Sequence, residues 1–405
     1  MNRLKGLNYT IVETDLFLLI TCLLTSAFGV LMVYSATRSG LDEGELLDRD
    51  CLIMIAAVGL GLIGCVIISL LDYEAFVRLW PVIGGIAVLL MVSLFFIGEG
   101  PSDRPDAICW IAIPLGGGRS VNFQPSELVK IGFIITFTAH IEAVKDNINS
   151  LKNVLLLCLH GVVPVALVIL TGDLGSALVF VAIFVAMMFV AGINLRYFIA
   201  AAGAGIVACP ILWVKFFSEF QKQRFLAIYW PSALEEDVYK KIIFQQERCV
   251  NAIGCGRLLG SGLFKGVYTQ SPTASGSVPV NESDMIFSVV GEELGFIGAA
   301  GLLIVLAVII LRIASTAKKS RNLSGSLLCY GIAFMIGSQA IINIGMCLKL
   351  LPCIGITLPF ISSGGSSNLC VYLAIGIVLS VYRFNTNRAP VNFRLSHIST
   401  PFSES

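Results

Sequence analysis

The ionisable side chains that interrupt the long apolar stretches of this sequence are the first candidates for chemistry. A charged group inside a membrane span costs at least ~2.5 kcal/mol on insertion scales, so each one needs a partner or a function. Asp284 stands where one apolar run begins, with Glu282 before it and Glu292 and Glu293 two turns later. Carboxylates crowded at one boundary raise one another's pKa or bind a divalent cation. The pattern predicts a functional site at Asp284, with Asp284 and Glu282 as candidate ligands for Mg²⁺ or Mn²⁺.

A second group of polar residues opens another apolar run. Glu127 and Lys130 are three residues apart, which places them on one face of a helix and lets them neutralise one another. Two interpretations stay open: a salt bridge that only stabilises the fold, or a pair that also lines a polar cavity. Just before the pair, Pro125 is expected at the turn and Ser126 as the cap of the helix.

Two further segments could bind an anion or simply shape the chain. Asp173 precedes Leu174, where its carboxylate can accept the free N–H groups of a helix; capping alone and a functional role explain it equally well. The motif GITLPFISSGGSS, from Gly355 to Ser367, joins two apolar runs. Such a loop can re-enter a membrane only where protein or a cavity surrounds it. Its N–H groups and hydroxyls suit an anion, although paired glycines flanked by serines also occur in inert turns.

Composition defines the elements that must position these residues. The 405 residues are 56% hydrophobic and 13% charged, with a mean hydropathy of +0.87, which excludes soluble globular and disordered proteins. A net charge of +1 without basic clusters gives no support to a nucleic-acid partner. The lipid bilayer is therefore the expected environment. Most of the twelve cysteines lie in apolar runs, where Cys behaves as a small hydrophobe, and Cys249 with Cys255 is the one candidate disulfide.

Apolar runs of about the length that crosses a bilayer predict an all-α, polytopic membrane protein with about ten transmembrane helices. A short run at 128–142 and an indistinct boundary near 171–174 leave nine or eleven spans as alternatives. The polar segment before the first run is short, which favours an uncleaved first helix over a signal peptide. The ten runs cover 16–35, 52–71, 79–98, 128–142, 154–171, 174–193, 197–217, 286–312, 325–348 and 368–382.

The distribution of Lys and Arg predicts the orientation. Segments on the side of the N-terminus carry most of the basic residues outside one long loop, which the positive-inside rule leaves out of the count. Both termini are therefore expected in the cytoplasm, with a tail at about 383–405. The long loop, at about 215–284, is expected outside the cell, within a single membrane domain that covers 1–405. Its stretch from Lys215 to Trp230 mixes basic and aromatic residues and predicts an interfacial helix, with a solvated connector as the alternative.

The order of the motifs resembles the SEDS family of shape, elongation, division and sporulation proteins across nearly the whole chain. Within the long loop, a series of glycines ends in GLFKGVYTQ, and this ending is closer to the RodA branch than to the FtsW branch. The matching motifs are YSA at Tyr34–Ala36, WI at Trp110–Ile111, FQPSELVK at Phe123–Lys130, GDLGSA at Gly172–Ala177, AIGCGRLLGSG at Ala252–Gly262, SDMIFSVVGEELG at Ser283–Gly295 and LPCIGITLPFISSGGSS at Leu351–Ser367.

The resemblance implies an activity and its partners. Proteins similar to this one lie in the bacterial cytoplasmic membrane and polymerise lipid II, a disaccharide-peptide on undecaprenyl pyrophosphate, on its extracytoplasmic side. They work with a class B penicillin-binding protein that crosslinks the strands. The family's essential acidic residue falls on Asp284, and the substrate-binding candidates fall on Trp110, Glu127, Lys130, Asp173, Arg224, Gln246 and Ser366.

The sequence departs from the family pattern at several positions. Val280 stands where the family usually has Glu, and Ser363 where it usually has Tyr before the paired glycines. Val280 puts a second carboxylate role in doubt.

A mechanism follows as an expectation. Asp284 is the hypothetical general base, and Arg224 and Lys130, or a divalent ion, would stabilise the departing pyrophosphate. A lipid II flippase, a non-catalytic scaffold for the penicillin-binding protein and an FtsW-type division role are the alternatives. The flippase is disfavoured because ionisable groups gather at one boundary and no inverted repeat is visible.

Overall fold

The computed structural model describes residues 14–40, 46–100, 107–116, 119–215, 217–271, 273 and 276–387. Within these residues, ten long helices coincide with the ten apolar runs. They are α2 (Leu16–Thr37), α3 (Arg49–Leu70), α5 (Trp80–Ile97), α6 (Pro125–Val144), α7 (Leu151–Leu170), α8 (Leu174–Val190), α9 (Leu195–Lys215), α12 (Ile286–Lys319), α13 (Leu323–Cys347) and α14 (Gly365–Asn387). A short helix, α4 (Tyr73–Arg78), precedes α5. The prediction of a polytopic helical membrane protein is confirmed.

The ten long helices differ in length and in hydropathy, the two properties that identify a membrane span. Eight helices of the described chain are long and apolar enough to cross a bilayer. Helix α8 has 17 residues and is shorter, and α6 carries Glu127, Lys130 and Glu142 along its length. The sequence also marks these two places, since the run at 128–142 is short and the boundary near 171–174 is indistinct.

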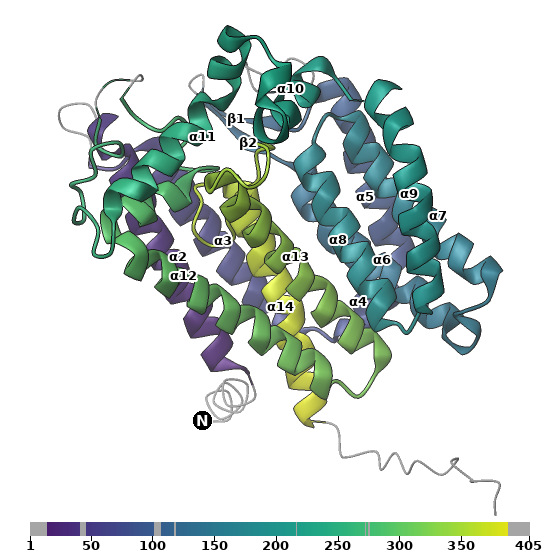
Figure 1. Ribbon diagram of the computed structural model, residues 1–405. Coiled ribbons are helices and arrows are strands. Elements are labelled where there is room, and N and C mark those ends of the chain that lie inside the picture. The colour runs from purple at the N-terminus through teal and green to yellow at the C-terminus, as the bar shows by residue number, and fades with distance from the viewer. Residues whose placement is uncertain are drawn as a thin grey trace, which may run out of the picture.

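Successive long helices run in opposite directions, which gives the bundle two distinct ends (Figure 1). Helix α2 begins and α14 ends at the same end, where Arg312 forms a salt bridge of 2.7 Å with Asp15. We call this the terminal end. The opposite end, here called the cavity end, carries most of the structure that lies outside the long helices.

The cavity end is built from segments that lie between the predicted transmembrane helices. A β-hairpin that the sequence did not predict, β1 (Ile111–Gly116) and β2 (Arg119–Phe123), lies between α5 and α6. The long loop contains two helices, α10 (Glu219–Tyr229) and α11 (Glu236–Gly256). Ser218 and Gln221 form a capping box that starts α10, inside the stretch predicted as an interfacial helix. All twelve cysteines are free, so Cys249 and Cys255 form no disulfide.

Helix α12 is interrupted near its start. Gly295 has φ of +65°, so the helix breaks between a first part, Ile286–Leu294, and a second part from Phe296 to Lys319. The chain from Arg257 to Gly262 occupies the break: Phe296 N–H donates to the Arg257 carbonyl at 2.8 Å, and Gly262 N–H to the Glu293 carbonyl at 3.0 Å. A Cβ on Gly260 would lie 2.1 Å from the Glu293 carbonyl oxygen, so only glycine allows this approach.

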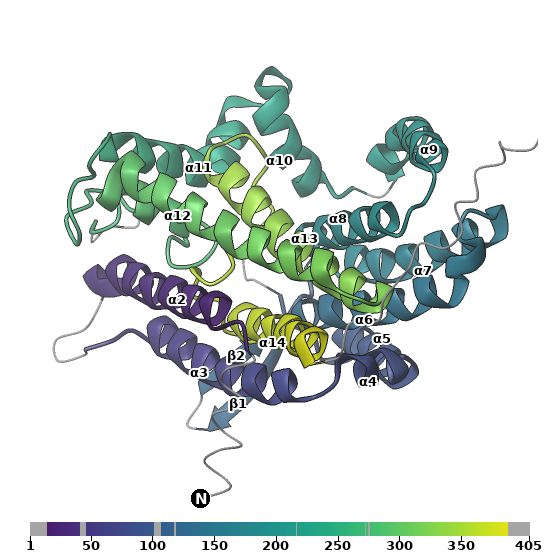
Figure 2. The ribbon, with the colours of Figure 1, turned by 90° about the horizontal axis from the view of Figure 1, so that it is seen from below.

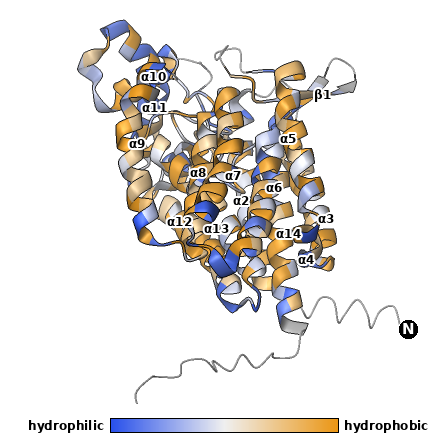
Figure 3. Ribbon diagram, turned by 90° about the vertical axis from the view of Figure 1, so that its right-hand side faces the viewer, coloured by the Kyte–Doolittle hydropathy of each residue, from blue (hydrophilic) through white to orange (hydrophobic). Residues whose placement is uncertain are grey.

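Packing is dense in the centre of the bundle and sparse at its edge. Helices α3 and α14 pack closely, with Gly61 against Tyr372 and Gly376 against the Cys65 backbone. Helix α9 instead stands at the periphery, and none of its most apolar stretch is buried (Figure 2). The long helices are hydrophobic over most of their length, while hydrophilic residues gather toward their ends (Figure 3). Many large apolar side chains on these helices are exposed. This is the surface that a bilayer requires.

Candidate active site

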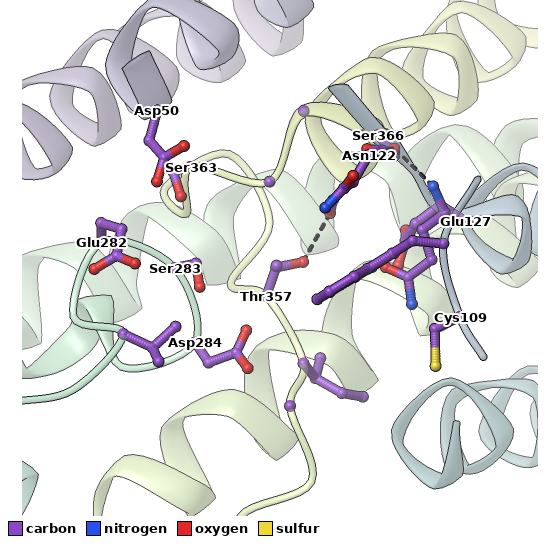
Figure 4. A pocket seen from close by; sticks show the side chains of 18 of the residues that line it. Asp50, Cys109, Asn122, Glu127, Glu282, Ser283, Asp284, Thr357, Ser363 and Ser366 are labelled. Carbon is purple, nitrogen blue, oxygen red and sulfur yellow. Dashed lines mark hydrogen bonds between the residues drawn. The ribbon is translucent and has the colours of Figure 1, made fainter. Parts of the chain in front are cut away.

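A polar cavity of about 410 Å³ opens among the loops of the cavity end. It draws residues from segments far apart in the sequence. In Figure 4, one side shows Asp50, Glu282, Ser283 and Asp284, and the other shows Cys109, Asn122, Glu127 and Ser366, with Thr357 between them. Asp173, Trp110 and Arg224 also line this cavity.

Asp284 is held at the cavity by α13 and by the loop that joins α13 to α14. The Asn343 amide donates to the backbone carbonyls of Asp284 and Ile356, both at 2.7 Å. Ser362 Oγ donates to the Ser283 carbonyl at 2.7 Å. The motif around the paired glycines is therefore buried in protein and lines a cavity, and its backbone positions the segment that carries Asp284.

Glu282 lies among other carboxylates on its side of the cavity. Burial raises the pKa of the Glu282 carboxyl, and the charges of Asp50, Asp284 and Asp48 raise it further. The Ser363 N–H donates to the Glu282 carbonyl at 3.0 Å, which fixes its backbone. The predicted crowding of carboxylates exists here, with Asp50 and Asp48 as members that the sequence did not indicate.

Glu292 and Glu293 correct one part of that prediction, because they do not face the cavity. Glu292 accepts hydrogen bonds from the Tyr268 and Thr269 N–H groups and from Thr269 Oγ1, at 2.6–2.8 Å. Glu293 accepts from Ser35 Oγ at 2.7 Å, from the Phe264 N–H and from Gln270. Both are fully buried, and they fasten the loop after α11 to the first part of α12.

The pair at the start of α6 combines both interpretations left open by the sequence. Lys130 Nζ lies 2.7 Å from Glu127 Oε1, and both side chains are buried. Glu127 also lines the cavity, whereas Lys130 lies behind it. Ser126 is not the cap as predicted, because α6 already begins at Pro125, whose missing N–H is harmless at the first helical position.

Asp173 caps a helix and also lies at the cavity. Its Oδ1 accepts the Ser176 N–H at 2.9 Å and caps α8. Its Oδ2 accepts from the Gln124 amide at 2.8 Å and from Ser126 Oγ at 3.3 Å, which joins the starts of α6 and α8. The carboxylate also lines the cavity, so capping and a functional role are compatible here.

Two arginines supply positive charge to the cavity. Arg224 on α10 donates from Nη1 to the Cys353 carbonyl at 2.7 Å, and its guanidinium lies 4.3 Å from the centre of the Phe220 ring. Arg49 lines the cavity from the start of α3 and donates to the Ser120 carbonyl. Lys130, the other predicted cation, is not part of the lining.

The remaining predicted residues divide between the cavity and the core. Trp110 lines the cavity next to the hairpin, where its backbone pairs with Glu99. Ser366 lines it too, and its Oγ accepts the Gln124 N–H at 2.9 Å. Gln246 does not reach it: the buried amide donates to the Met346 and Leu351 carbonyls at 2.9 and 2.8 Å. The neighbouring residue, Gln245, lines the cavity instead.

Several residues that line the cavity were not predicted as site residues. Asp50 carried a signal, because it is a carboxylate at the boundary of an apolar run, as Asp173 and Asp284 are. Asn122 carried none. Gln245 stands beside the predicted Gln246, and Thr357 belongs to the motif Gly355–Ser367, but neither was named as a site residue. Thr357 Oγ1 donates to Ser367 Oγ at 2.9 Å, a contact that depends on the fold of the loop.

One side of the cavity, here called the acidic wall, carries Asp50, Glu282 and Asp284. It fits a divalent cation only if the ligand supplies part of the coordination. Among the described residues, no group of three or more His, Cys, Asp and Glu is arranged to hold a metal ion. Mg²⁺, however, is commonly bound by one or two carboxylates together with the phosphates of a substrate. Glu282 and Asp284 in one cavity with Arg224 suit a cation of that kind, which arrives with a phosphate-bearing ligand.

The bundle and its polar cavity define a multi-pass membrane protein whose buried polar residues converge at one end. The family model described as cell cycle protein, which covers FtsW, RodA and SpoVE, matches residues 15–387. The chain belongs to this family, the SEDS family that its motifs resemble, and it is accordingly a protein of the bacterial inner membrane.

Relatives and solved structures extend over nearly the whole chain. It is 32% identical over 389 residues to the probable peptidoglycan glycosyltransferase FtsW of Geobacter sulfurreducens, covering 93% of this chain and 97% of that protein. It is 31% identical over 384 residues to the stage V sporulation protein E of Bacillus subtilis, covering 92% and 97%.

The fold comparison agrees with these relatives. A chain from a peptidoglycan synthase complex that coordinates polymerization and crosslinking matches with a TM-score of 0.74 and 25% identity, over 93% of this chain and 99% of that one. The rod shape determining protein RodA of Thermus thermophilus matches with a TM-score of 0.65 and 25% identity, over 93% and 98%. Because the relatives carry the names of several branches, assignment to the RodA branch stays a prediction.

Proposed function

We propose that this enzyme is a peptidoglycan glycosyltransferase that polymerises lipid II into glycan strands during cell elongation and shape control. Similarity to proteins named probable peptidoglycan glycosyltransferase supports the activity. The observation that carries the proposal is the cavity itself, where the Asp284 carboxylate shares one lining with Arg224 and Trp110. A base, a cation and an aromatic surface for a sugar thus meet in one place.

The reaction joins two saccharides at the expense of a lipid pyrophosphate. The oxygen of the acceptor's 4-hydroxyl attacks the anomeric carbon of the donor, and the bond from that carbon to the pyrophosphate oxygen breaks. Asp284 takes the hydroxyl proton as general base. Arg224, with Arg49 on the same lining, stabilises the negative charge of the leaving undecaprenyl pyrophosphate. A divalent cation bound at Glu282 and Asp284 would supply further charge neutralisation when present.

The orientation of the bundle follows from the same proposal. The cavity end faces the extracytoplasmic side, and the terminal end faces the cytoplasm, as the positive-inside rule predicts. The polyprenyl tail stays in the bilayer while the sugars enter the cavity. A class B penicillin-binding protein receives the strands for crosslinking.

Removing the base tests the assignment. The purified Asp284→Asn protein is reconstituted with its penicillin-binding partner and supplied with labelled lipid II. We expect polymer formation to fall by about 10²- to 10⁴-fold, the usual contribution of a general base, with an unchanged melting temperature. Normal polymer yield would exclude Asp284 as the base.

A matched control and separate assays discriminate the rival functions. Asp237→Asn alters an exposed carboxylate in the first turn of α11 at the same end and should keep full activity. If the partner alone makes glycan strands, the chain is a scaffold. If labelled lipid II only changes leaflet and no polymer forms, the chain is a flippase.

A division role is the second candidate, because several relatives carry the FtsW name. Depletion of the chain in its host distinguishes the two. Loss of rod shape supports elongation, and filaments without septa support division.

A further inference from the structure

A second cavity of about 290 Å³ lies beside the first at the cavity end. Asp50 and Glu282 line both cavities, so the acidic wall of the first is shared with the second. The rest of the second lining consists mostly of hydroxyl and amide groups. It includes Thr37, Ser39, Asp48, Thr269, Ser271, Ser277 and Asn281.

The second cavity has an excess of negative charge. Asp48, Asp50 and Glu282 line it, and none of them forms a salt bridge with another described residue. Arg49, the neighbour of two of these acids in sequence, donates instead to the Ser120 carbonyl on the hairpin. Phosphate is therefore repelled from this cavity, whereas a cationic group is attracted.

Asn281 is an independent indication of a ligand. Its side chain is 7% exposed, lines the second cavity and makes no hydrogen bond within the described chain. A largely buried amide that faces a cavity without a protein partner is available to form hydrogen bonds with a ligand.

We propose that the second cavity is a subsite for the polyhydroxylated, ammonium-bearing part of the substrate, the sugar and amine-carrying peptide. This inference rests on the proposed function and extends it. Carboxylates and amide oxygens accept from an ammonium group, and serine and threonine hydroxyls pair with saccharide hydroxyls. The arginines of the first cavity hold the pyrophosphate, and the carboxylates of the second hold the ammonium group. The two cavities therefore bind the oppositely charged ends of the substrate and orient it.

The test compares a substrate amine with its neutral form. Lipid II with a free peptide amine and lipid II with the amine acetylated are supplied to the full-length chain and its partner, and the rate is measured against substrate concentration. We expect acetylation to raise KM about tenfold for the wild type, as loss of one charge-assisted hydrogen bond implies. Asp48→Asn and Asn281→Ala should reduce that difference while kcat changes little.

Asp48→Asn is designed to preserve the fold. Asp48 accepts the Asp50 N–H at 2.9 Å and caps α3, and Asn caps a helix about as well as Asp. Asp72→Asn is the matched control, because Asp72 caps α4 through the Glu74 N–H at 3.0 Å at the terminal end. It should keep the full preference for the free amine.

Each outcome separates the inference from the proposed function. Equal KM values for the two substrates in the wild type would overturn the subsite, while the polymerase activity would stand. An unchanged preference in both Asp48→Asn and Asn281→Ala would overturn it as well. If Asp48→Asn alters only the dependence of the rate on MgCl₂, the cavity is a metal site and the inference is wrong. No polymer from either substrate in the wild type would refute the proposed function itself.

Discussion

Two pairs of acidic residues, nine to ten positions apart, have opposite environments in this protein. Glu282 and Asp284 lie in the loop before α12 and line a cavity, with other carboxylates as neighbours. Glu292 and Glu293 lie in the first part of α12, fully buried, and each accepts at least three hydrogen bonds. A buried carboxylate that is saturated with donors stabilises a fold, whereas one facing like charges in a cavity is available to a ligand.

The contrast explains why proximity in sequence is a poor guide to shared function. All four carboxylates are costly to place in lipid and lie at one boundary of an apolar run, so the sequence predicts a single cluster. The break at Gly295 and the glycines after α11 bring N–H donors to Glu292 and Glu293 only. Variants of the two pairs should therefore affect different measured properties.

The largest effect on stability is expected from Glu292→Ala. The substitution leaves the Tyr268 and Thr269 N–H groups and Thr269 Oγ1 without an acceptor in the protein interior. We expect a loss of ~3 kcal/mol or more, since each unsatisfied buried group costs about 1–3 kcal/mol. Thermal unfolding of the purified protein in detergent measures it. Asp284→Asn should show the reverse, with a native melting temperature and lost activity, and equal stability losses in both variants would contradict the contrast.

Val280 offers a smaller effect on the cavity side. This β-branched residue has φ of +55°, a conformation that is costly for Val, and its side chain is 44% exposed, so little packing depends on it. Asn tolerates this conformation better. Val280→Asn should therefore stabilise the protein by about 1 kcal/mol, the lower end of such strain, with Val267→Asn as an exposed control without positive φ. A lower melting temperature for Val280→Asn would mean that the Val side chain makes a needed contact.

The smallest expected effect is the pH dependence due to Glu282. Burial, and then the neighbouring carboxylates, raise the pKa of Glu282 in the folded state. At a pH above the unfolded pKa, Glu282 therefore keeps a proton in the folded state that it loses in the unfolded state. Wild-type stability then falls as pH rises through the interval between the two values. Glu282→Gln removes this dependence. Its melting temperature relative to the wild type should increase between about pH 4 and pH 8, and a constant difference would show that Glu282 does not titrate in this way.

The long helices and the place of Asp284 at the cavity were predictable because lipid imposes strong rules on sequence. Ten apolar runs became ten helices, and Asp284, Glu127 and Asp173 were found because charge near lipid is costly. Motif order added Trp110, Arg224 and Ser366, all of which line the cavity. These residues either violate the membrane rule or belong to a recognisable motif.

The misplaced residues depended on contacts that no local pattern encodes. The choice between Gln245 and Gln246 is a matter of helix phase: adjacent residues on α11 point about 100° apart, and only the fold determines which one faces the cavity. The β-hairpin was missed because its short strands lie in a loop between spans. Lys130 was predicted to face the substrate, yet its salt bridge with Glu127 keeps it in the interior.

The break at Gly295 also has a consequence for the order of assembly. The part of α12 from Phe296 onward is apolar and can enter the bilayer as an independent helix during synthesis. The part that carries Glu292 and Glu293 cannot be accommodated in lipid alone, since its carboxylates need donors from Ser35, Phe264 and Thr269. This segment is expected to dock late, after α2 and the chain following α11 are in place, so the completed cavity marks the end of biogenesis.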